Sequence, residues 1–189
     1  MDRSRDLHVY ALFAGVLDYP GPGLADAARR CAAQVGEVNP EAGALLGEFT
    51  AFVEAAPPAR LEEIYTATFD LDPSCTPYLS YHLLGESYTR SAFIVGLKAC
   101  YRARGFAVEN ELPDHLAVVL RFLSVCDDAA LADELIDDAL RPALARMLGA
   151  EAEAANPYQA VLRALQLILA PQAGGVPDAR QFQGASDYA

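Results

Sequence analysis

The residues of this sequence that are best suited to chemistry lie in one short segment. They are Glu111, Pro113, Asp114 and His115, and they follow an acidic loop and precede an apolar run. A histidine beside a carboxylate could transfer protons, because its pKa lies near neutrality. However, Asp114 and His115 are adjacent, and adjacent residues on a helix do not face each other. No nucleophile elbow, phosphate loop or metal motif accompanies them in the sequence, so capping and packing are favoured over catalysis.

The same segment predicts the start of a buried helix. Pro113 fits the first helical position, because its missing N–H would be unpaired there in any case. Asp114 would then lie in the first turn, at the positive end of the helix dipole. Apolar residues recur downstream with helical spacing and predict a core stripe, which consists of Leu116, Val119, Leu120 and Leu123.

Aromatic residues at helical spacing form a second group of candidates. Tyr65 and Phe69 are one turn apart, as are Tyr78 and His82, with Tyr81 beside them. One interpretation is an ordinary aromatic core. The other is a groove lined by tyrosines, whose hydroxyl groups reach the backbone of a bound peptide. A peptide with an apolar face would suit such a groove, and the sequence leaves both interpretations open.

The elements that would position these residues are all helical. Helices are predicted over 7–18, 24–35, 39–55, 59–69, 76–84, 86–104, 113–123, 128–148 and 157–169. Asn39 and the pair Asp127 and Asp128 are expected to cap the third and the eighth of them. Gly36 and Gly105 are expected to end the second and the sixth, and Pro142 predicts a kink or a split. We therefore expect an all-α single-domain bundle of about eight or nine helices over residues 1–170. Residues 171–189 have no periodic apolar face and are predicted to form a disordered tail.

Charge and apolar content exclude several classes of function. The chain of 189 residues has 14 basic and 26 acidic side chains, which give a net charge of −12. Nucleic acid is disfavoured as a partner, because neutralising phosphates requires a basic face. The acidity would suit a basic peptide, although it could also serve solubility alone. No apolar run reaches the roughly 18 residues of a membrane span. The start of the chain lacks a signal-peptide pattern, so a cytoplasmic location is expected.

Cysteine and histidine are scattered along the sequence. They occupy Cys31, Cys75, Cys100 and Cys126, and His8, His82 and His115. No C-x-x-C pair occurs, and the spacings match neither a zinc cluster nor a small disulfide framework. We expect free thiols, mostly buried, and predict neither a metal site nor a cofactor bound by this chain.

Three blocks of the sequence resemble a family of cytosolic chaperones that assemble molybdenum-cofactor oxidoreductases. The blocks are residues 65–70, residues 81–86 and residues 111–116. The closer similarity is to the nitrate reductase delta-subunit (NarJ-type) branch of the TorD/DmsD group. About a third of the chain is covered well, and the flanks agree as helical pattern. Pro77 and Ser91 depart from what members of the family have at these positions.

The resemblance implies a TorD/NarJ-like fold and a system-specific chaperone that is not an enzyme. Its expected partner is the N-terminal peptide of a molybdopterin-dependent reductase catalytic subunit, with nitrate reductase first among the clients. It would assist cofactor insertion and assembly, and cofactor-insertion proteins are further expected partners. Because residues 111–115 match the peptide-binding region of the family by position, the resemblance implies that they bind that peptide. The predicted peptide-binding residues are Tyr65, Phe69, Tyr78, Tyr81, His82, Glu111, Pro113, Asp114 and His115. The alternative function is a helical adaptor or regulator that binds an unrelated partner.

Overall fold

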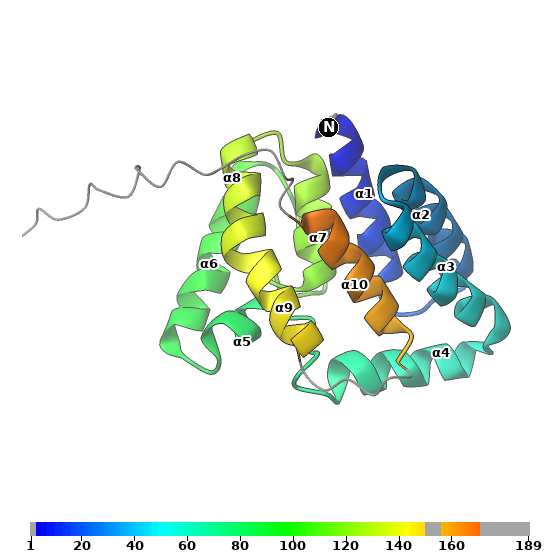
Figure 1. The fold of residues 1–189 in the computed structure, drawn as a ribbon. Coiled ribbons are helices and arrows are strands. Elements are labelled where there is room, and N and C mark those ends of the chain that lie inside the picture. Colours follow the sequence, from blue (N-terminus) through cyan, green and yellow to red (C-terminus); the bar gives the residue numbers. More distant parts are fainter. Residues whose placement is uncertain (1–2, 150–155, 171–189) are drawn as a thin grey trace, which may run out of the picture.

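A computed structural model describes residues 3–149 and 156–170, and the regular elements of this part of the chain are helices (Figure 1). Its α-helices are α1 (Arg3–Val16), α2 (Leu24–Val38), α3 (Pro40–Ala55), α4 (Pro58–Tyr65), α5 (Leu79–Leu84), α6 (Tyr88–Ala103), α7 (Leu116–Val125), α8 (Ala129–Glu134), α9 (Arg141–Gly149) and α10 (Tyr158–Leu169). Two π-helical segments, Thr66–Asp70 and Leu135–Leu140, prolong α4 and join α8 to α9. The described residues thus form nine continuous helices, which confirms the all-α prediction. The predicted tail at 171–189 lies outside them.

Helix α7 lies at the centre of the bundle. Its predicted core stripe is confirmed, because Leu116, Val119, Leu120 and Leu123 are all at most 1% exposed. Helix α1 packs against α7 and α2, and α10 packs against α3 and α9. Figure 1 shows α4 lying across the lower end of these helices. A helix that is apolar over most of its surface is stable only when neighbours cover it on several sides.

Two predicted helix caps are confirmed. The Asn39 side chain accepts a hydrogen bond from the Ala42 N–H at 3.1 Å, just before Pro40 opens α3. The Asp128 side chain accepts one from the Leu131 N–H at 3.2 Å and starts α8. Each side chain satisfies a backbone donor that has no partner within its helix.

The predicted end of the second helix at Gly36 is wrong. Helix α2 continues through Gly36 to Val38, and Gly36 lies against Gly43 of α3. A Cβ placed on Gly43 would lie only 2.4 Å from the Gly36 Cα. The two glycines therefore permit a close crossing of α2 and α3, and Gly36 does not act as a helix terminator.

The fifth helix begins later than predicted, at Leu79 and not at Thr76. Tyr78 is extended, just before α5, and pairs with His115 in an isolated antiparallel bridge. The Leu79 N–H donates to the Asp114 carbonyl at 2.9 Å, and the Leu116 N–H donates to the Pro77 carbonyl at 2.7 Å. These bonds join segments that are distant in sequence, so local helix signals could not predict them.

The predicted helix start at Pro113 is also wrong. Helix α7 begins at Leu116, and His115 is its N-cap, with Nδ1 accepting from the Ala117 N–H at 3.2 Å. Pro113 and Asp114 form the buried turn before it. The bridge to residues 77–79 holds His115 extended, which excludes it and the two residues before it from the helix.

Pro142 neither splits its helix nor ends it. The helix is continuous from α8 into α9, and the π-helical segment Leu135–Leu140 lies directly before Arg141 and Pro142. Proline cannot donate the usual helical hydrogen bond, and a local widening of the helix accommodates such an irregularity.

Candidate functional site

A cleft of about 440 Å³ opens where five segments of the chain meet. We call it the acidic cleft. It is lined by Asp18, Tyr19, Tyr65, Asp70, Pro77, Tyr78, Glu109, Asn110, Glu111, His115, Val118 and Arg121. The bridge between Tyr78 and His115 forms part of its wall. The structure therefore brings together four of the predicted residues here: Tyr65, Tyr78, Glu111 and His115.

Tyr78 and Glu111 are fixed to each other in the acidic cleft. The Tyr78 hydroxyl donates to Glu111 Oε1 at 3.0 Å, and the same oxygen accepts from the Leu112 N–H at 2.8 Å. Burial, together with this hydrogen bond, raises the pKa of Tyr78 to about 12. The phenol therefore stays protonated and holds the carboxylate in one position.

His115 presents a neutral imidazole to the acidic cleft. Because Nδ1 accepts the capping hydrogen bond from Ala117, the proton of the neutral ring is assigned to Nε2. Burial lowers the pKa of His115; the carboxylates of Glu111 and Asp18 oppose this shift. The ring also stands edge to face against Tyr78, with 5.5 Å between centroids. His115 can thus donate one hydrogen bond while remaining uncharged.

Carboxylates dominate the charge of the cleft. Asp70, Glu109 and Glu111 are exposed residues that line the cleft. The one cation in the lining, Arg121, forms an ion pair with Asp18. Asn110 adopts a left-handed backbone conformation with φ of 60°, which turns the chain between the two glutamates. A ligand with basic side chains would meet a complementary charge here.

Asp114 and Pro113 lie beneath the surface and line no described cleft. Asp114 is fully buried, and its Oδ2 accepts from the Ser80 hydroxyl and from the Ser80 N–H. Arg90 Nε donates to the same hydroxyl at 3.1 Å, which links a cation to the buried carboxylate. The Pro113 carbonyl accepts from the buried Tyr101 hydroxyl at 2.9 Å. Both residues therefore position the turn that carries His115 and do not offer a contact to a ligand.

Tyr65 and Phe69 belong mainly to an aromatic core cluster. Their ring centroids are 4.9 Å apart, and the Phe69 ring lies 5.0 Å from that of Tyr158. The Tyr65 hydroxyl donates to the Leu17 carbonyl at 3.3 Å, and burial raises the pKa of Tyr65. Tyr65 also lines the acidic cleft, whereas Phe69 does not.

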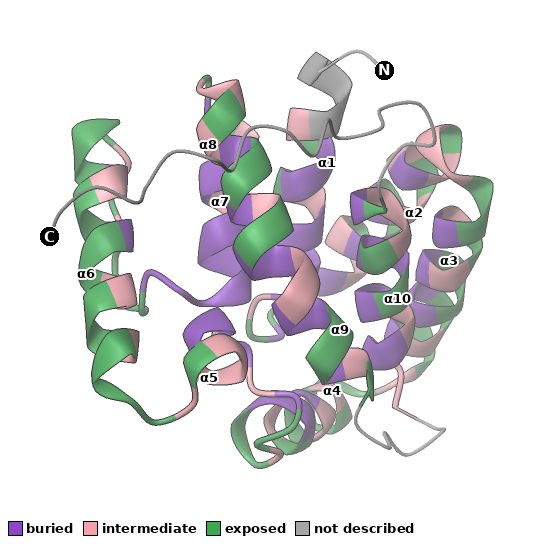
Figure 2. Cartoon of the chain, turned by 60° about the vertical axis from the view of Figure 1, so that its left-hand side comes forward, coloured by how far each residue is buried: buried purple, intermediate pink, exposed green. Residues whose placement is uncertain are grey.

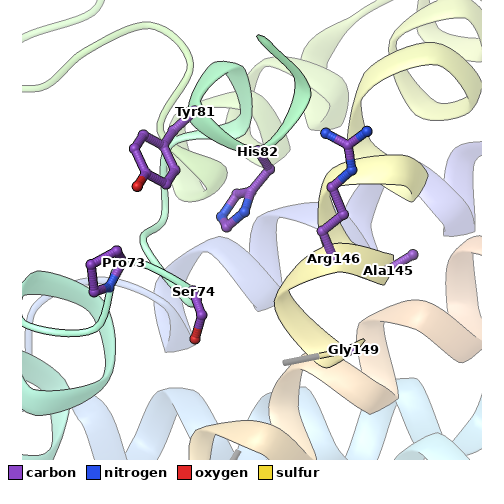
Figure 3. Close-up of a pocket in the computed structure, with 7 residues that line it drawn as sticks. All are labelled: Pro73, Ser74, Tyr81, His82, Ala145, Arg146 and Gly149. Carbon is purple, nitrogen blue, oxygen red and sulfur yellow. The ribbon is translucent and has the colours of Figure 1, made fainter. Parts of the chain in front are cut away.

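Tyr81 and His82 line a different cleft, of about 670 Å³. Figure 3 shows these two α5 side chains on one side of it and Arg146 of α9 on the other. His82 Nε2 lies 2.7 Å from the Thr76 carbonyl, and burial lowers the pKa of His82. The neutral ring therefore donates to that carbonyl. The predicted peptide-binding residues are therefore divided between two clefts and the interior, which holds Phe69, Pro113 and Asp114.

Sequence reasoning missed several residues of the acidic cleft. Asp18 and Tyr19 were interpreted only as the end of the first helix, and Arg121 lies within the core helix α7. Asp18 and Arg121 are 103 positions apart, and their ion pair has no local signal. The one available signal is the resemblance at residues 65–70, which includes Asp70.

The described residues contain no group of three or more His, Cys, Asp or Glu side chains placed to hold a metal ion. All four cysteines are free, and all except Cys100 are buried, which confirms the thiol prediction. No described helix has the length and apolar character that crossing a bilayer requires.

Comparison with known proteins assigns this chain to a family. The family model described as nitrate reductase delta subunit matches residues 36–165, more than half of the chain. The chain is similar to the nitrate reductase-like protein NarX of Mycobacterium tuberculosis, at 31% identity over 122 residues. That match covers 64% of this chain and only 18% of the relative. A crystal structure of a candidate redox enzyme maturation protein from Archaeoglobus fulgidus is similar with a TM-score of 0.58 and 25% identity, covering 87% of this chain and 93% of that one.

Proposed function

This chain belongs to the nitrate reductase delta-subunit family, and we propose that it is an assembly chaperone for a molybdopterin-dependent reductase. In this proposal it binds the N-terminal segment of the catalytic subunit, nitrate reductase being the first expected client. It keeps the subunit competent for cofactor insertion, and proteins that deliver the cofactor are further partners. Family membership and the similar redox enzyme maturation fold support a role in maturation.

The observation that carries the peptide-binding part is the acidic cleft. Its tyrosines offer apolar ring surface, and Tyr19 is 57% exposed there. Apolar contact would supply most of the affinity, at roughly 25 cal/mol per Å² before the costs of association. The unpaired carboxylates would steer a basic segment into the cleft, and this steering weakens with salt.

A binding role accounts for His115 better than catalysis does. Its Nδ1 is used as a helix cap, and the Asp114 carboxylate bonds Ser80 and not the imidazole. A general base needs an unprotonated nitrogen that faces the substrate proton, whereas here Nδ1 accepts the cap and the proton of the neutral ring is on Nε2. The described contacts leave Nε2 as the hydrogen-bond donor of the ring, and in this proposal it bonds a carbonyl of the peptide.

Co-purification tests the proposal directly. The chain is tagged and co-expressed with the catalytic subunit of a molybdenum-dependent nitrate reductase from the same genome. The full-length subunit should co-purify, and a version that lacks about its first twenty residues should not. Equal capture of both versions would contradict binding through the N-terminal segment. Failure to capture any molybdoenzyme subunit would favour the alternative, a helical adaptor for an unrelated partner.

A charge-reversal variant then tests the location. Glu111→Arg should weaken capture because it reverses charge in the acidic cleft and removes the acceptor for Tyr78. Glu48→Arg is the matched control, since Glu48 is an exposed carboxylate on α3 that lines no described cleft. Arg146→Glu, in the cleft of Tyr81 and His82, decides whether that second surface contributes. Loss of capture from Arg146→Glu alone would move the site there.

A further inference from the structure

One stretch of this acidic chain is basic. Residues 88–108, which comprise α6 and the turn after it, contain four of the 14 basic residues and none of the 26 acidic ones. Arg104 is paired with Asp128, and Arg90 bonds Ser80 and lies over the Tyr81 ring. Lys98 and Arg102 form no ion pair with any described residue. These two cations are one helical turn apart and lie on the same side of α6.

Lys98 and Arg102 flank a third cleft, of about 530 Å³, which we call the basic cleft. The other side chains that line it include Tyr101, Phe106 and Val108. The rings of Tyr101 and Phe106 are 5.2 Å apart and rest on Phe122 of α7. The basic cleft therefore has an apolar part that rests on the core, two cations at its border, and the Glu111 carboxylate in its lining.

The basic cleft and the acidic cleft are neighbours. Both include Glu111, and the loop from Gly105 to Glu111 supplies residues to both. Gly105, at φ of 66°, ends α6 and turns the chain into this loop. A peptide that leaves the acidic cleft across Glu111 would thus reach an apolar surface and then two cations.

We propose that the bound peptide is charge-segregated: its basic residues lie in the acidic cleft, its apolar residues on Phe106 and Val108, and a carboxylate between Lys98 and Arg102. This inference rests on the proposed function and adds the acidic end of the peptide to it. The supporting observations are the opposite charges of the two clefts and their continuity at Glu111. Specificity would then depend on the order of charges along the peptide, because a wrongly placed charge meets a like charge.

Other occupants of the basic cleft fit less well. An anionic membrane surface is bound by several free cations and large apolar side chains on an exposed helix face. The outward face of α6 instead carries mostly small residues, such as Ala92, Gly96 and Ala99, and Tyr88 and Val95 are its two exposed large apolar side chains. A second copy of this chain would meet the cations through its acidic surface, and the effect of peptide on the oligomeric state distinguishes that case.

Three synthetic peptides of about eighteen residues and identical composition test the inference. In two of them arginines and glutamates occupy opposite ends of an apolar block, in either order, and in the third the charges are mixed. Fluorescence anisotropy at low salt measures their affinities for the full chain. One segregated peptide should bind several-fold more tightly than the mixed one. No preference, or no binding by either segregated peptide, would overturn the inference while leaving the co-purification test of the proposed function unaffected.

The variant Lys98→Glu/Arg102→Glu should weaken binding of the preferred peptide by about three- to tenfold, as expected for two exposed pairs. The same peptide with lysines in place of its glutamates should bind this variant again. Arg30→Glu/Arg163→Glu is the matched control, because it changes the net charge equally at exposed residues on α2 and α10. An equal loss in the control, or peptide-dependent dissociation of a dimer in size-exclusion chromatography, would overturn the assignment.

Discussion

Helices α6 and α7 follow each other in the chain, yet they are buried to opposite extents. Seven of the ten residues of α7 are buried, whereas α6 buries only Leu97 and Tyr101 among its 16. Figure 2 shows α7 mostly buried and α6 mostly exposed at one side of the molecule. The outward face of α6 includes Tyr88 and Val95, which are 91% and 65% exposed. One helix therefore supplies the scaffold, and the other supplies surface.

The difference shows what helical periodicity can and cannot indicate. Both sequences contain apolar residues at helical spacing, which predicts a face in each case. In α6 two neighbouring faces are apolar, and the larger side chains of Leu97 and Tyr101 pack inward. Burying the larger face removes more apolar surface from water, so it is the more stable choice.

The largest effect is expected in α7. Leu120→Ala should lower the free energy of unfolding by about 2–5 kcal/mol, because Leu120 is fully buried and the change leaves a cavity. Urea unfolding followed by circular dichroism measures this loss. Val95→Ala in α6 is the paired control and should change stability by less than about 0.5 kcal/mol. Similar losses in the two variants would show that α6 is as buried in solution as α7.

The next largest effect is expected at the turn that joins the two regions. Asp114→Ala should cost about 1–3 kcal/mol, since it leaves the buried Ser80 hydroxyl and Arg90 without the carboxylate. The sequence predicted only a dipole contribution of about 0.3–1 kcal/mol from an exposed Asp114. Ser80→Ala alone and the double variant complete a cycle, and additive losses would mean that the two side chains are not coupled.

The all-α fold and most helix positions could be predicted from the sequence, because local signals specify them. Asn39 and Asp128 cap their helices as expected, and Leu116–Leu123 forms the core stripe. Gly105 also ends its helix in a left-handed conformation as expected. Each of these features depends on residues within a few positions of one another.

The errors arise where partners distant in sequence decide the local structure. Gly36 was interpreted as a helix end, but its role is set by Gly43 on the next helix. The starts at Thr76 and Pro113 were wrong because these two segments pair with each other across the Tyr78–His115 bridge. For the same reason the acidic cleft could be predicted only in part, from the resemblance.

A smaller effect is expected from pH, through the histidine that caps α7. Burial lowers the pKa of His115 in the folded state, whereas the unfolded value stays near about 6.5. The folded state then binds fewer protons, so stability is present above about pH 6.5 and is lost as the pH falls through the folded value. The groups that act on this ring are Glu111, Asp18, Arg121 and Asp114.

Thermal unfolding between about pH 8 and 5 measures this dependence. His115→Asn should flatten it, because asparagine retains a side-chain acceptor for the cap but does not titrate. The pKa of His82 is lowered in the same direction, so the double variant should flatten the curve further. His8→Asn is the control on exposed surface, and an unchanged slope in His115→Asn would exclude His115 as the titrating group.

The smallest effect is expected on the outward face of α6. Tyr88 is 91% exposed, so Tyr88→Ser removes little buried surface and should shift the melting temperature by no more than about 1–2 °C.

Tyr101→Phe at the other end of the same helix is the contrasting variant. It removes the hydroxyl that donates to the Pro113 carbonyl at 2.9 Å, and its cost should be about 0.5–1.5 kcal/mol. If Tyr88→Ser instead lowered the melting temperature as much as Tyr101→Phe, this end of α6 would be covered in solution. Repeating the scan at several protein concentrations would then separate a self-associated chain, whose melting temperature rises with concentration, from a monomer that covers the face with its own residues.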